Sequence, residues 1–275
     1  MLTYTLPAGT ACIDKQSNGQ SLSWYQALLQ SGVHAVLLDM MTGNVQPDIQ
    51  NALTAELAVM IFQGFYTPAF AIPAQATVRA QMIVGAAKAA GFPSGQNAPV
   101  LWLDLEACGS VPADAIFSWV TNWGQVVQQA GYQAGLYVGA GQPLSSQQLY
   151  SIPTITHYWR SASNVPAVAV RGYEILQGKW NQIFEGVSVD YDTVQVDAKG
   201  SLPIAVTLST GPNAPTFEAL VQRVAALEQS VTTTNTHLTS LTNTLNTLSG
   251  TLQQAQHQLT LHESRWNAIK QIFNS

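Results

Sequence analysis

Two acidic residues stand close together at the end of an apolar stretch of the sequence. The stretch is VLWLDLEACG, residues 100–109, and the acids are Asp104 and Glu106. Because alternate residues of a strand point to the same side, a strand here would place both carboxylates on one face. A buried carboxylate without a partner is costly unless its pKa changes. A protonated acid beside an ionised one is the arrangement that glycosidic bond hydrolysis requires.

Other apolar stretches also carry acids close to their carboxyl ends. If these stretches are parallel strands of one barrel, their carboxyl ends meet at one rim, where active sites of such barrels are built. Several carboxylates in one mouth raise one another's pKa, because like charges resist joint ionisation. The acids at these ends are Asp14, Asp39, Asp104, Glu106, Asp190 and Asp192.

Structural roles are the alternative for these acids. Asp39 could equally cap a loop, and Asp192 could equally pair with Lys179 or Arg171. We therefore treat Asp39 and Asp192 as candidate substrate ligands only. The candidate catalytic residues are Glu106, Asp104, Asp14 and Asp190, with a purely structural network as the alternative interpretation.

Aromatic side chains near the same strand ends could stack on the apolar faces of sugar rings. Tyr66 closes a strand and is a candidate for substrate binding, whereas Tyr137 and Trp159 could equally belong to the core. The aromatic residues near these ends are Tyr66, Trp102, Tyr137, Trp159, Tyr173 and Trp180.

Residues 1–200 alternate between short apolar stretches and longer amphipathic ones, which predicts a parallel sheet covered by helices. Eight strands in about 200 residues fit a compact (β/α)8 barrel of the TIM type, an α/β fold, with a doubly wound open sheet as the alternative. The expected strands are residues 10–16, 34–41, 59–66, 100–106, 134–140, 157–163, 173–178 and 187–195. The expected helices are residues 21–32, 48–58, 77–91 and 112–131.

The remainder of the chain differs in composition and in the spacing of its apolar residues. Residues 201–216 contain three prolines and predict a linker. From Phe217 to Ser275, apolar residues recur with alternating spacings of four and three, which is typical of a long coiled-coil helix. Such a helix cannot bury its apolar stripe alone, so we expect a homo-oligomer, a parallel trimer in preference to a dimer.

Composition excludes several classes of function. The chain of 275 residues has a formal net charge of -5, and its ten Lys and Arg residues form no run, so we expect neither nucleic-acid nor anionic-membrane binding. The beginning of the sequence predicts no signal peptide and no transmembrane helix. The five histidines and two cysteines are scattered, so no metal site and no cofactor are expected.

The ordered motifs of residues 8–197 resemble family 25 glycoside hydrolases, the phage and bacterial lysozymes that cleave peptidoglycan, and a related set of glycoside-hydrolase-like barrels of unknown function. The similar segments are ACIDKQSNG, LWLDLE, GLYVG, ILQG and VSVDYDTV. The resemblance implies that Glu106 is the general acid, that Asp104, Asp14 and Asp190 assist it, and that Gln177 lies at the substrate. It implies no metal.

Three positions depart from the family pattern. Cys12 replaces the usual glycine, Asp192 replaces the asparagine of the last motif, and Lys15 follows Asp14, where its charge could depress the pKa of a neighbouring acid. The sequence therefore predicts a muramidase-like enzyme on an oligomeric stalk, acting at the cell wall as a phage virion or extracellular component without a signal peptide. The alternative is an inactive barrel that binds glycans or is purely structural.

Overall fold

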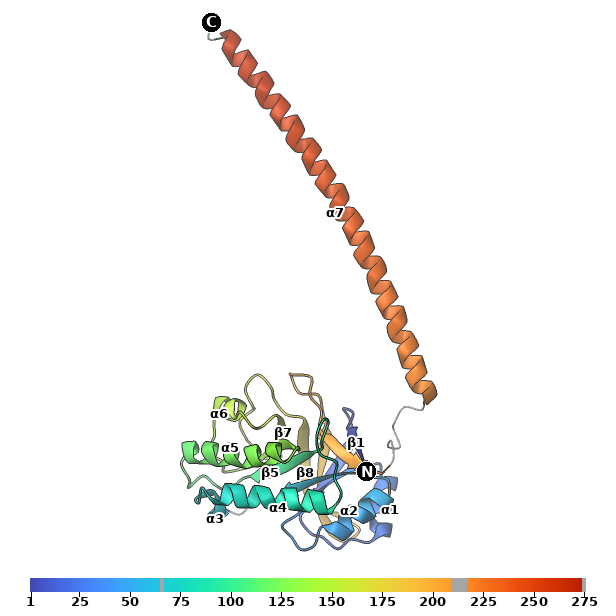
Figure 1. Ribbon diagram of the computed structural model, residues 1–275, viewed down its shortest axis with the longest axis vertical. Helices are drawn as coiled ribbons and strands as arrows, with labels where there is room; N and C mark the ends of the chain where they lie inside the picture. The colour runs from blue at the N-terminus through green and yellow to red at the C-terminus, as the bar shows by residue number, and fades with distance from the viewer. Residues whose placement is uncertain (65–66, 209–216, 274–275) are drawn as a thin grey trace. The chain divides into compact units, whose positions relative to one another are not determined.

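The computed structural model shows two compact units, Met1–Asn213 and Ala214–Ser275 (Figure 1). The described residues are 1–64, 67–208 and 217–273, with the side chains of residues 229, 231–232, 234–267 and 269–270 in the last helix. No helix among these residues is both long enough and apolar enough to cross a membrane.

Eight strands of the first unit close into a barrel. β2 to β8 are parallel to one another in sequence order, and β9 pairs with both β8 and β2, which closes the ring. These strands coincide with the eight predicted apolar stretches, so the closed barrel is confirmed over the open sheet. Their bounds are β2 (Ala11–Lys15), β3 (Ala35–Asp39), β4 (Ala58–Gln63), β5 (Val100–Leu105), β6 (Gln133–Val138), β7 (His157–Arg160), β8 (Ile175–Phe184) and β9 (Val187–Val194).

The direction of the eighth strand differs from the all-parallel barrel that we expected. β9 runs antiparallel to both neighbours, because only Glu185 and Gly186 separate it from β8. Both residues have positive φ, 46° and 77°, as a tight two-residue hairpin requires. A parallel crossover needs a dozen or more residues. Consequently Asp190, in the first half of β9, lies directly opposite Asp14 on β2.

Helices cover the outside of the barrel, as predicted. α5 buries Trp119, Val120, Trp123 and Val127 at spacings of three and four, and Figure 1 shows it beside α4. With helices outside and side chains filling the interior, the strands are buried on both faces, which explains their continuous apolar runs. The helices of this unit are α1 (Leu22–Gln30), α2 (Gln46–Thr54), α3 (Thr67–Phe70), α4 (Gln75–Ala89), α5 (Ala113–Gln129) and α6 (Ser146–Ser151).

Two further strands close the end of the barrel opposite the carboxyl ends of β2 to β8. β1 (Leu2–Thr5) pairs antiparallel with β10 (Ile204–Thr207), from Leu2 opposite Thr207 to Thr5 opposite Ile204, and β10 joins β4 near its start. Leu6 and Ala205 are buried in the same interior cluster as Trp102. Part of the segment that we expected to be a linker, residues 201–216, is therefore a strand, and residues 209–216 lie outside the described residues.

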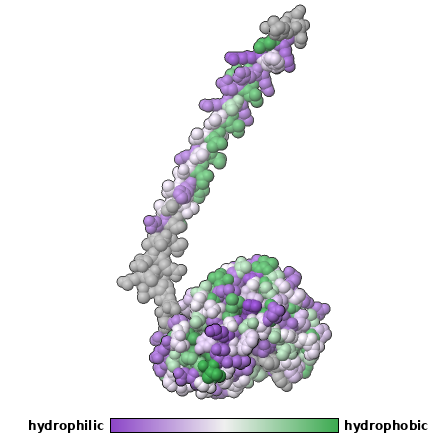
Figure 2. Space-filling model, turned by 180° about the vertical axis from the view of Figure 1, so that it is seen from behind, coloured by the Kyte–Doolittle hydropathy of each residue, from purple (hydrophilic) through white to green (hydrophobic). Residues whose placement is uncertain are grey.

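The second unit is the helix α7 (Phe217–Phe273). Its predicted stripe positions that can be described are exposed, with Leu245 at 70% and Leu248 at 66%. Figure 2 shows hydrophobic side chains gathered along one side of the helix. The long helix is confirmed, whereas its pairing with other chains stays a prediction.

Candidate active site

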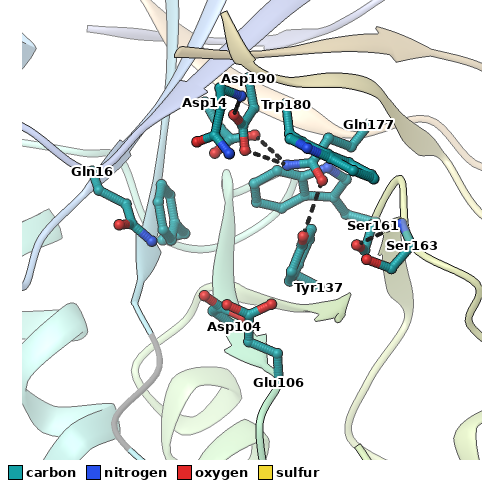
Figure 3. A pocket seen from close by; sticks show the side chains of 13 residues that line it. Asp14, Gln16, Asp104, Glu106, Tyr137, Ser161, Ser163, Gln177, Trp180 and Asp190 are labelled. Atoms are coloured by element: carbon teal, nitrogen blue, oxygen red, sulfur yellow. Dashed lines mark hydrogen bonds between the residues drawn. The ribbon is translucent and has the colours of Figure 1, made fainter. Parts of the chain in front are cut away.

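A cavity of about 260 Å³ opens at the carboxyl ends of the parallel strands. Figure 3 shows that it collects side chains from β2, β5, β6, β8 and β9, and all four candidate catalytic acids line it. We call this cavity the acid lobe. Its lining residues are Asp14, Gln16, Phe62, Asp104, Glu106, Tyr137, Trp159, Ser161, Ser163, Gln177, Trp180, Asn181 and Asp190.

Asp104 and Glu106 enter the acid lobe together from the end of β5, as their spacing predicted (Figure 3). The position of Glu106 depends on a glycine at position 139, because a Cβ atom on Gly139 would lie 2.3 Å from the Glu106 Cβ and 2.6 Å from its Oε2. Directly after Glu106, Ala107 has a φ of 52°, a left-handed conformation that is costly for a residue with a side chain. Its N–H donates to the carbonyl of Ala140 at 2.8 Å, which holds this turn against the loop after β6.

Asp14 and Asp190 occupy another wall of the acid lobe, and one amide bridges them. Gln177 Nε2 donates to Asp14 Oδ2 at 2.9 Å and to Asp190 Oδ2 at 3.0 Å. Gln177 Oε1 accepts from the Tyr137 hydroxyl and from the Ala162 N–H, both at 3.1 Å. These two donors fix the orientation of the amide, so its NH2 group must face the carboxylates.

The environment of these acids favours their protonated forms. Burial, and after it the charge of Asp190, raises the pKa of Asp14 to about 8. Burial and the same charge raise the pKa of Glu106 above its usual value. Burial also raises the pKa of Asp190, although the Asn181 N–H, which donates to its Oδ1 at 2.6 Å, opposes this effect. The cluster therefore holds protons at a pH where free carboxyl groups have lost them.

Asp192 lies deeper in the barrel than Asp190. It is buried and accepts a hydrogen bond from Trp159 Nε1 at 2.8 Å. Burial, followed by the charge of Asp14, raises the pKa of Asp192 well above its usual value. The ion pair considered as its alternative role is absent, because Arg171 pairs instead with Asp197 at 3.0 Å and Lys179 is exposed. Asp192 therefore does not line the cavity, and it contacts the site through Trp159, which does.

Asp39 has the loop-capping role that was its alternative interpretation. Its Oδ1 accepts from the backbone N–H groups of Met41 at 2.8 Å and Gly64 at 3.0 Å. A Cβ atom on Gly64 would lie 2.6 Å from Asp39 Oδ2, so a glycine is required there. Asp39 is buried and does not line the acid lobe.

Lys15 lowers the pKa of Asp48, not that of the acids that line the acid lobe. It is 1% exposed and points away from the barrel interior, where its Nζ lies 2.8 Å from Asp48 Oδ1. Asp48 also accepts from the Tyr25 hydroxyl at 2.5 Å and from the Gly19 N–H at 2.6 Å. Burial opposes ionisation of Asp48, but these hydrogen bonds outweigh it and lower its pKa. This cluster positions the loop that follows β2.

The aromatic candidates separate into buried and exposed residues. Tyr137 and Trp159 have their ring centroids 4.5 Å apart and are buried at the lobe, and Trp102 is fully buried beneath them. Tyr66 lies outside the described residues. Trp180, by contrast, lines the acid lobe and is 51% exposed.

Five of the lining residues were not singled out from the sequence, namely the buried Phe62 and four polar residues. Ser161 and Ser163 follow β7, so the strand-end rule that selected the acids could have selected them. Gln16 follows β2 in the same way. Asn181 has a φ of 53° in an irregular stretch of β8, and no sequence signal marks it. Among the described residues, no group of three or more His, Cys, Asp and Glu could hold a metal ion.

A closed α/β barrel with four carboxylates around one cavity at the strand ends has the architecture of glycoside-hydrolase barrels. The chain belongs to the family of the Rv2525c-like, glycoside hydrolase-like domain, which matches residues 7–199. This match supports the glycoside-hydrolase-like barrel, but it does not single out family 25, to which the sequence motifs pointed first. None of the curated proteins matches the chain significantly.

Solved structures share the fold at low sequence identity. An uncharacterized B. stearothermophilus protein has a TM-score of 0.53 and 16% identity, over 68% of this chain and 96% of that one. The Clostridium perfringens spore cortex lytic enzyme SleM has a TM-score of 0.50 and 13% identity, over 69% of this chain and 68% of that one. At these identities the likeness extends to the fold alone.

Proposed function

We propose that the barrel is a glycoside hydrolase that cleaves the glycan of bacterial peptidoglycan by carboxylate acid catalysis. The observation that carries this proposal is the placement of Glu106 and Asp104 in one cavity with the Asp14–Gln177–Asp190 bridge. The family match supports a glycosidase-like barrel, and the fold of SleM, described as a spore cortex lytic enzyme, supports a cell-wall glycan as the substrate.

Glu106 is the general acid of the proposed reaction. Burial and the charge of Asp190 raise its pKa and favour its protonated form, so it can transfer its proton to the glycosidic oxygen as the bond to the sugar carbon breaks. Positive charge develops at that carbon, and the carboxylates of Asp104 and Asp190 stabilise it. Water supplies the incoming oxygen, and the proton that it loses returns to Glu106 through the cluster, which restores the general acid.

The test is reducing-end release from purified peptidoglycan by the full chain and by Glu106→Gln. We expect the variant to lose at least about 100-fold in kcat, because the amide cannot donate the catalytic proton. Asp114→Asn is the matched control, since Asp114 is exposed at the start of α5 and should leave activity unchanged. If the wild type binds the glycan tightly without turnover, the barrel is an inactive binding module instead. If the wild type shows neither binding nor turnover, the barrel has a purely structural role.

We also propose that α7 assembles three copies of the chain in parallel. The exposed stripe includes Leu238, Leu245 and Leu252, and a shallow apolar groove widens it. Thr244 and Thr251 flank the groove and donate their hydroxyls to the carbonyls four residues earlier, which leaves their methyl groups to face a partner. An apolar face wider than the two-position seam of a dimer favours a third chain.

Sedimentation of the full chain against a chain ending at Ser209 tests this assembly. We expect a trimer for the full chain and a monomer for the shortened one. If both chains sediment as monomers, the assembly is excluded. If the full chain sediments as a dimer, the third copy is excluded. The assembly suits a phage virion or an extracellular component that presents barrels at a cell wall, and antibody labelling of purified phage particles from the source strain checks that setting.

A further inference from the structure

A second cavity of about 320 Å³ adjoins the acid lobe. The two cavities share Asp14, Gln16, Asn181 and Asp190 as lining residues, so these four form the boundary between them. The second cavity continues between the loop after β2 and the start of β9, where Ser17 and Ser188 line it. We call it the serine lobe.

The β8–β9 hairpin lies along both lobes. Trp180 lines the acid lobe, Asn181 lines both, and Ser188 lines the serine lobe. The pairing of β8 with β9 is irregular between Gln177 and Gln182, which brings both Gln177 and Trp180 to the same cavity. The hairpin is also tied to an acid, because the Asn181 N–H donates to Asp190 Oδ1 at 2.6 Å.

We propose that the substrate is an extended glycan chain that occupies both lobes and crosses the acids, with Trp180 stacking on one of its sugar rings. This inference rests on the proposed function and goes further by specifying how the chain lies. Each lobe is close to the lower limit of ligand pockets, roughly 300 Å³, so a chain that fills both gains contacts that a short fragment cannot make.

The chemistry of the lining suits sugars. Trp180 offers an apolar face that is half exposed, while the other aromatic rings described at the lobe, those of Phe62, Tyr137 and Trp159, are buried. Serine hydroxyls and the amides of Gln16 and Asn181 match the hydroxyl groups of a sugar.

The test uses labelled, size-fractionated glycan fragments of two to eight sugars prepared from peptidoglycan. For the wild-type full chain, kcat/KM should rise at least about tenfold from the shortest fragments to those that fill both lobes. Ser188→Trp should fill the serine lobe and reduce kcat/KM for long fragments to the value for short ones, while short fragments are cleaved normally. Thr193→Trp is the matched control, an exposed residue of the same strand that lines neither lobe.

Trp180 is tested separately. Trp180→Ala should raise KM roughly 3- to 10-fold with little change in kcat, and Trp180→Phe should recover most of the loss, because stacking contributes to binding. A kcat/KM independent of fragment length, or equal losses on short and long fragments in Ser188→Trp, would overturn the inference while turnover itself persists. If no fragment is cleaved, the proposed function fails, and the same fragments then test the inference by calorimetry, where affinity must rise with length.

Discussion

Replacing Asp14 with asparagine should remove a steep source of pH dependence from the stability of the barrel. Burial and the charge of Asp190 raise the pKa of Asp14 from its usual 3.8 to about 8. The folded state therefore holds this proton more tightly than the unfolded chain does. The resulting stabilisation is complete below pH 3.8 and is lost as the pH rises through about 8.

The size of the effect follows from the two pKa values. For one such group, the free energy of unfolding falls by on the order of 3 kcal/mol between pH 5 and pH 8. In a barrel of this length that loss lowers Tm by about 6–12 °C. Asp192, Glu106 and Asp190 have shifts of the same sign, so Asp14→Asn should keep part of the wild-type slope.

Urea unfolding followed by tryptophan fluorescence, at pH 5 and at pH 8, measures the effect. The wild type should lose more stability than Asp14→Asn over this interval, by the amount given above, and Asp114→Asn should behave as the wild type. If Asp14→Asn shows the wild-type difference between the two pH values, the buried proton does not reside at Asp14, and our account of the cluster is wrong.

Two further substitutions test contacts around the site. Gly139→Ala should displace Glu106, because the new Cβ would lie 2.3 Å from the Glu106 Cβ. We expect this variant to lose about 1–3 kcal/mol of stability in thermal unfolding and most of its activity. The control is Gly85→Ala, in open space on α4, which should stabilise the barrel by up to about 1 kcal/mol. Lys15→Met should cost about 3–5 kcal/mol in urea unfolding, because it leaves the buried Asp48 carboxylate without its cation. The double variant Lys15→Met with Asp48→Leu should recover part of this loss. Equal stabilities of the single and double variants would contradict the ion pair.

The sequence predicts the strands of the barrel well, because each is buried on both faces and is therefore an uninterrupted apolar run. It does not predict the direction of β9 from those runs alone. The informative signal was the length of the connection, since Glu185 and Gly186 are too few for a crossover. The short strands β1 and β10 were missed because four residues give too little periodicity to separate a strand from a loop.

The candidate site was predictable where residue type and strand end coincide. Asp14, Asp104 and Glu106 come together because the carboxyl ends of β2 and β5 meet at one rim. Asp190 was expected at the carboxyl end of a parallel strand, but it lines the same cavity because β9 is antiparallel and the beginning of β9 reaches that rim. The sequence could not show that Asp39 turns to the backbone of its own loop, since that depends on the room left by Gly64. Such contacts join residues from different strands and follow only from closure of the ring.

The pairing of β1 with β10 also determines how the barrel unit would respond to mechanical load. Leu2 lies opposite Thr207, so the chain enters and leaves this two-stranded ribbon at the same edge. A force that pulls these two ends apart would peel the four residue pairs one after another, beginning with Leu2 and Thr207, instead of shearing them all at once. We expect this ribbon to open at low force while the closed ring of eight strands stays intact.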